Sequence, residues 1–69
     1  MKIKFFNETD TALLEFTDHA VEETREISEN IYIDLDVHGN LVSMTIEHAR
    51  ETAHFPDIAY QQIDKTVNA

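Results

Sequence analysis

The sequence predicts an α+β fold, a small antiparallel β-meander of four or five strands with a C-terminal helix packed on one face. Two observations favour it. Apolar and polar residues alternate through most of residues 1–48, which is the period of a half-buried strand. After Glu47 the period changes, and Pro56 follows as a helix-starting residue. With 69 residues the chain is expected to form one domain, with the sheet in residues 1–48 and a helical segment in residues 49–69.

The stretch 31–48 predicts the central hairpin of the sheet. Ile31, Ile33 and Leu35 alternate with polar residues, and so do Val42, Met44 and Ile46. Facing residues of an antiparallel pair share a side, so the two apolar sets meet if Leu35 lies opposite Val42. This register leaves residues 37–40 as a four-residue loop, in which Gly39 supplies a positive φ at little steric cost.

The preceding residues predict two further strands and an edge strand. Residues 1–6 and 11–16 both alternate, and a turn at residues 7–10 sets Phe5 against Ala12 and Ile3 against Leu14. After a second turn at residues 17–19, residues 20–27 are expected to form the third strand. Charged residues occur on both of its sides, which is typical of a sheet edge.

The C-terminal part predicts two helical pieces. Residues around Ala49 and Ala53 suit a short helix that Pro56 ends. A second helix is expected to begin at Pro56 and to lie on the apolar side of the sheet. Its apolar stripe consists of Ala59, Tyr60, Ile63 and Val67, and residues 67–69 are expected to fray.

The charge of the chain excludes several classes of partner. Fourteen acidic and five basic side chains give a net charge of -9, and residues 1–48 hold -8 of it. Such a chain repels phosphate backbones and anionic lipids, so we expect neither nucleic acid nor a membrane as a partner. A small basic protein is the natural complement. The N-terminus has no apolar signal segment, no stretch is long enough to span a membrane, and the chain contains no cysteine, which together favour a cytoplasmic location.

Acidic residues and histidines could hold a metal or act in catalysis, but their spacing argues against both. Asp34, Asp36 and Gly39 follow the start of a calcium loop, whose twelfth position should be glutamate and is Thr45 here. His48 and His54 are six residues apart, which is not the i, i+4 spacing of a zinc helix, and the other histidines are His19 and His38. Paired carboxylates have no nucleophile or anion-binding loop beside them. We expect no metal, no cofactor and no enzymatic activity.

These residues resemble a small bacterial family catalogued as domain of unknown function 2283. The resemblance covers about residues 1–50 and is carried by residues 2–5, 10–16, 23–27, 31–36 and 39–42, with Ile46 and Ala49. It implies a small antiparallel sheet with a C-terminal helix, and no established activity or catalytic residues. Some relatives are encoded beside small toxins similar to ribosome-dependent RNases, which implies an antitoxin-like role. Residues 56–69 continue beyond the family pattern.

The sequence therefore predicts an uncharacterised acidic protein-binding module, antitoxin-like, that neutralises a small basic partner. Charge complementarity would speed association, and apolar anchors would supply affinity. The alternatives are a small-ligand or metal-binding regulatory protein and a structural homo-oligomer, for which a homodimer is the simplest form. The candidate contact residues combine apolar anchors with the acids around them: Tyr32, Leu41, Asp34, Asp36, Glu22, Glu23 and Glu26.

Overall fold

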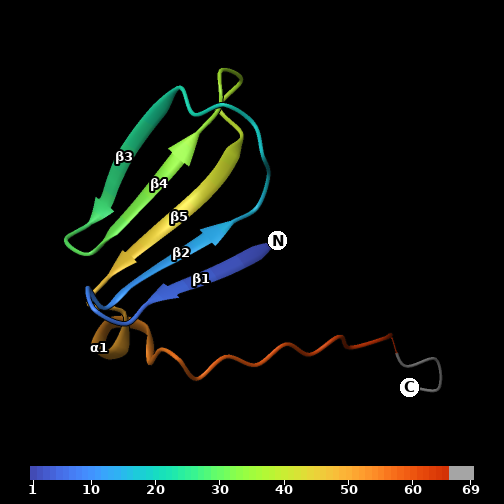
Figure 1. Cartoon of the computed structure of the whole chain (residues 1–69). Helices are drawn as coiled ribbons and strands as arrows, with labels where there is room; N and C mark the ends of the chain where they lie inside the picture. The colour runs from blue at the N-terminus through green and yellow to red at the C-terminus, as the bar shows by residue number, and fades with distance from the viewer. Residues whose placement is uncertain (66–69) are drawn as a thin grey trace.

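A computed structural model describes residues 1–65 and contains one sheet with a short helix at one end (Figure 1). Within these residues the elements in chain order are β1 (Lys2–Phe6), β2 (Thr11–Glu15), β3 (Glu23–Ser28), β4 (Ile31–Leu35), β5 (Leu41–Glu47) and α1 (Ala49–Ala53). All neighbouring strands are antiparallel. The predicted α+β fold with five antiparallel strands and a C-terminal helix is confirmed.

The strands lie in the order β1-β2-β5-β4-β3, so β5 occupies the centre of the sheet. The segment 16–22 has no regular structure and carries the chain from β2 to the far edge (Figure 1). It is anchored at both ends: the backbone N–H of Phe16 donates to the carbonyl of Val42, and that of Glu22 donates to the carbonyl of Leu35, each at 2.8 Å. The predicted edge position of the third strand is confirmed, although β3 begins later than residue 20.

The register of the first hairpin is confirmed, with Phe5 opposite Ala12 and Ile3 opposite Leu14. The central hairpin follows the predicted pairing at Ile31 with Ile46 and at Ile33 with Met44. At its upper end the prediction is wrong, because an irregularity after Asp34 places Leu35 opposite Leu41 rather than Val42. Gly39 has the expected positive φ, at 81°.

The core lies where α1 packs on β5 at one end of the sheet. Ala12, Ile46 and Ala49 are buried there, and Phe5 and Phe55 pack against them with Leu14, Met44 and Ala53. The rings of Phe5 and Phe55 stack with centroids 5.5 Å apart. Small side chains at the centre let the helix approach the sheet, and the aromatic pair closes its side.

The turn between β1 and β2 holds the helix in place. Asp10 has a left-handed backbone, with φ of 55°, which directs its carbonyl toward the start of α1. The carbonyl of Asp10 accepts a hydrogen bond from the backbone N–H of Ala49 at 2.9 Å. The carboxylate oxygen Oδ1 of Asp10 accepts one from the backbone N–H of Arg50, also at 2.9 Å. The predicted short helix before Pro56 is confirmed.

The predicted second helix is wrong as far as the structure describes it. Residues 57–65 have no regular secondary structure and run away from the sheet, so no part of the described sheet or helix covers the stripe of Ala59, Tyr60 and Ile63 (Figure 1). A helix of about twelve residues is marginal in water without tertiary packing, which explains the difference. Val67 and the frayed end expected at residues 67–69 lie outside the described residues. In residues 1–65, no helix is long and apolar enough to cross a membrane.

Candidate functional site

The sheet has two unlike faces, because successive residues of a strand point to opposite sides. One face carries the core. The other carries polar rows: Tyr32 lies between Glu26 of β3 and Thr45 of β5, and Asp34 lies between Thr24 and Ser43. We call the four residues Glu26, Tyr32, Asp34 and Glu47 the acidic face.

Tyr32 is the centre of the acidic face. It is half-buried on the middle strand of β3, β4 and β5. The charges of Glu47 and then Glu26 raise the pKa of its phenol above the usual 10.0, since an anion beside two carboxylates is disfavoured. The arrangement is an aromatic ring flanked by negative charges, which favours a cation such as a lysine or arginine side chain.

Asp34 has a fixed orientation on the same face. The hydroxyl of Thr24 donates to its Oδ1, and the hydroxyl of Ser43 donates to its Oδ2 at 2.6 Å. Neutral donors from both neighbouring strands hold the carboxylate without cancelling its charge. Asp34 therefore contributes a preorganised negative charge beside Tyr32.

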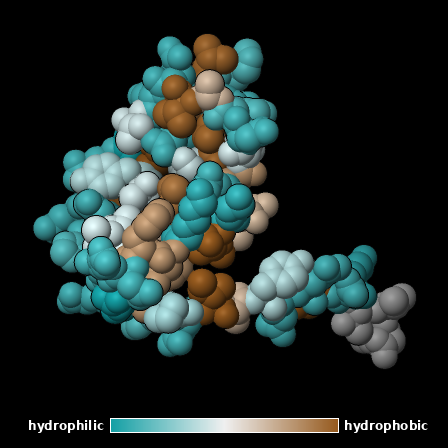
Figure 2. Space-filling view, viewed as in Figure 1, coloured by the Kyte–Doolittle hydropathy of each residue, from teal (hydrophilic) through white to brown (hydrophobic). Residues whose placement is uncertain are grey.

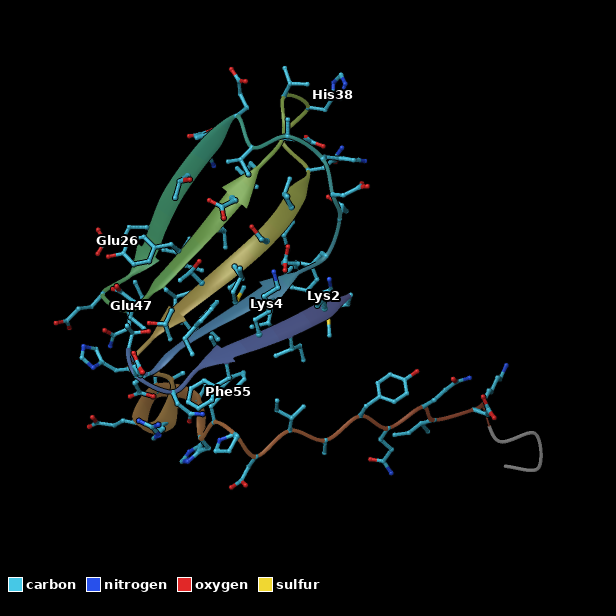
Figure 3. All side chains as sticks on the ribbon, in the orientation of Figure 1. Lys2, Lys4, Glu26, His38, Glu47 and Phe55 are labelled. Atoms are coloured by element: carbon cyan, nitrogen blue, oxygen red, sulfur yellow. The ribbon has the colours of Figure 1, made fainter. Side chains whose placement is uncertain are left out.

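The lysines on this face of the sheet lie at its other edge, on β1. Figure 3 shows Glu26 and Glu47 on one side and Lys2 and Lys4 on the other. Lys4 contacts Glu15 of β2, with 2.9 Å between Nζ and Oε1, and this hydrogen bond lowers the pKa of Glu15. The positive charge of Lys4 is thus paired within the β1–β2 half, which leaves the β3–β5 half negative.

Asp36 does not belong to the acidic face, although the sequence places it among the candidate contact residues. It is only 7% exposed, beside the loop between β4 and β5. Its Oδ1 accepts the backbone N–H groups of His38 and Asn40, and its Oδ2 lies 3.0 Å from Nδ1 of His19. The hydrogen bonds from Asn40 and then His19 lower the pKa of Asp36 from 3.8 to about 2. Its role is to close the loop.

The remaining candidates are dispersed. Glu23 pairs with Leu35, on the side opposite Glu26, and forms an ion pair with Arg25 at 2.8 Å. Glu22 is an exposed residue of the segment 16–22, and Leu41 is 37% exposed at the start of β5. The structure brings together Tyr32, Asp34 and Glu26 of the seven candidates.

Glu47 was missed in the sequence analysis. Its signal was present, because alternation along β5 puts it on the same face as Thr45, the partner of Tyr32.

The described residues, 1–65, offer little support for a small-ligand or metal site at the acidic face. A surface hollow of about 390 Å³ lies at the β1–β2 turn between Phe5 and Thr9, away from the acidic face. Over the same residues, no three side chains of the metal-binding types come together. Asp34 and Asp36 both use their carboxylate oxygens in internal hydrogen bonds, unlike the open ligands of a calcium loop.

These features define a small α+β domain whose five-stranded sheet is packed on one face and acidic on part of the other. The chain belongs to the family described as "Protein of unknown function (DUF2283)", whose model matches residues 2–50. The match ends within α1, so residues 51–69 lie beyond it. No curated protein and no solved structure matches the chain.

Proposed function

We propose that this protein is a non-enzymatic, cytoplasmic protein-binding module that binds a small basic partner through its acidic face, in the manner of an antitoxin. The observation that carries the proposal is the position of Tyr32 between Glu26 and Glu47, next to the fixed carboxylate of Asp34. An arginine or lysine of the partner would lie over the Tyr32 ring and pair with these carboxylates.

The distribution of charge supports a basic protein as the partner. The net charge of -9 attracts a cationic protein over a distance and repels nucleic acid. Thr45 and Leu13 continue the row between Tyr32 and Lys4, so the acids are bordered by less polar residues. Aromatic and apolar contacts of this kind supply affinity, whereas the charges supply rate and specificity.

A small-ligand or metal-binding regulatory function has less support. Two surface hollows of residues 1–65 lie near β1 and β2, and neither is lined by Tyr32. The carboxylate oxygens of Asp34 already accept hydroxyl groups, which reduces their value as metal ligands.

The test is isolation of the tagged full chain from its source cells at low and high salt, with mass spectrometry of co-isolated proteins. We compare the wild type with Glu26→Gln/Glu47→Gln, which removes two charges from the acidic face and keeps its shape. The control, Glu8→Gln/Glu51→Gln, removes two exposed charges elsewhere. A basic protein that the wild type and control recover in equal amounts, and that high salt or the acidic-face variant releases, is the expected result.

Two outcomes contradict the proposal. Recovery of the chain alone at both salt concentrations would argue against a tightly bound basic partner. Equal loss of a partner in both double variants would mean that overall charge, rather than the acidic face, determines binding.

A further inference from the structure

The core-bearing face of the sheet is covered unevenly. At one end α1 and Phe55 pack over Ala12 and Ile46, and at the other Leu35 and Val42 are buried, next to the ends of the segment 16–22. Between these ends runs one cross-strand row, which the register defines as Ile3, Leu14, Met44 and Ile33. We call these four residues the apolar row. All four are half-buried, so each presents some apolar surface to solvent.

The segment 57–65, which we call the arm, also has no packing partner among residues 1–65. Ile58, Tyr60 and Ile63 are 53%, 86% and 79% exposed. Its contacts are local, such as the hydrogen bond from the backbone N–H of Asp57 to the carbonyl of His54. Figure 2 shows the arm standing clear of the sheet, with hydrophobic and hydrophilic residues side by side.

We propose that two copies of this chain form a dimer by exchanging arms, so that residues 58–63 of each copy lie across the apolar row of the other. The lengths agree. The four strands of the apolar row, about 4.8 Å apart, span ~14 Å, and six extended residues span ~20 Å. One arm therefore covers the whole apolar row.

The charge pattern identifies a second copy as the occupant. Residues 58–63 contain no charged residue, in a chain in which 28% of residues are charged. The four residues of the apolar row are also uncharged, and Arg25, which follows Ile33 in the register, is paired with Glu23. Two copies with a charge of -9 repel each other over most of their surface, so association is least costly where neutral, apolar elements meet. A basic partner would gain nothing from this neutral arm.

The buried area fits a weak dimer. The six extended residues 58–63 are ~20 Å long and cover roughly 200 Å² if the strip is about 10 Å wide. Reciprocal exchange buries one such strip of arm and one apolar row on each copy, which gives about 800 Å² in total. This is the size of a weak, reversible interface, and a single arm would bury half as much.

Exchange leaves the acidic face open, because the apolar row lies on the other side of the sheet. The dimer would therefore present two acidic faces directed away from each other. This arrangement keeps the strongest negative charges apart and gives the assembly two equivalent binding surfaces.

The test is the mass of the full chain in solution by light scattering, with the wild type, the arm variant Tyr60→Ser/Ile63→Ser and the control Val21→Ser/Val37→Ser. Each variant replaces two exposed apolar residues, so the fold of one copy should not change. We expect twice the chain mass of 8.0 kDa for the wild type and control. The arm variant should raise the dissociation constant at least ~100-fold with an unchanged circular dichroism spectrum.

Mixed-label NMR locates the contact in the dimer. With one copy ¹³C-labelled and the other unlabelled, we expect contacts between the methyl groups of Ile33 or Met44 and protons of Tyr60 from the other copy. A wild type that stays at 8.0 kDa at about 500 μM, or contacts that arise within one chain, would overturn the proposal. Dimerisation that survives in the arm variant would overturn it as well.

Discussion

The Oδ2 atom of Asp36 lies 3.0 Å from Nδ1 of His19, which joins the loop after β4 to the segment between β2 and β3. The same carboxylate accepts two backbone N–H groups from that loop. One buried side chain thus ties together two segments that share no strand pairing.

Replacement of Asp36 by alanine should lower the midpoint of thermal unfolding, since it leaves the N–H groups of His38 and Asn40 without their acceptor. A fall of several degrees is expected for a domain of this size. The control is Asp57→Ala, which removes an exposed carboxylate. Equal midpoints for the two variants would contradict the role given to Asp36.

Asp36 should also make stability depend on acid. Its pKa is lowered from 3.8 to about 2 in the folded chain, so the unfolded chain binds its proton first as the pH falls. The stabilisation is complete above about pH 5 and is lost between roughly pH 4 and pH 2. Urea unfolding of the wild type and Asp36→Asn across this range measures the free energy of unfolding, which should depend less on pH in the variant. Parallel pH profiles would contradict the contribution of Asp36.

Replacement of Phe55 by alanine should destabilise the domain by about 1–3 kcal/mol, because it removes the ring stacked on Phe5 and opens the side of the core. Val37→Ala, at a position that is 71% exposed, should change stability by less than ~0.5 kcal/mol. Chemical unfolding measures both. A loss of equal size in the two variants would mean that Phe55 does not support the core.

Removal of the charges beside Tyr32 should bring its phenol pKa back toward 10.0. Glu47 and Glu26 raise that pKa, so the double variant Glu26→Gln/Glu47→Gln should titrate at lower pH than the parent chain. Phenolate absorbance measures this in a Tyr60→Phe background, which leaves Tyr32 as the single tyrosine. An unchanged titration would show that the three side chains do not form one cluster.

Much of the sheet could be predicted from alternation alone. The parity of apolar residues determines that Ile3 meets Leu14 and that Ile33 meets Met44, because any other register exposes one set. The irregularity beside Leu35 could not be predicted in this way. The irregularity lies next to the loop whose N–H groups Asp36 accepts. A local hydrogen bond of this kind cannot be inferred from the alternation of apolar and polar residues.

Strand alternation also predicted part of the candidate site. Tyr32, Asp34 and Glu26 share a face by strand register, whereas Asp36 lies past the end of β4, where alternation no longer determines direction. The second helix was expected from a stripe that includes Tyr60 and Ile63. A stripe shows that a helix would be amphipathic, and it does not show that a surface exists for it to cover.

The central position of β5 has a consequence for the order of folding during synthesis. β1 and β2 can pair as soon as they leave the ribosome, and β3 and β4 can pair next, but the two hairpins have no contact surface until β5 arrives between them. The sheet therefore closes only after residues 41–47 have emerged. Until then the nascent chain exposes the inner edges of both hairpins, and this is the interval in which it is most open to mispairing and to chaperones.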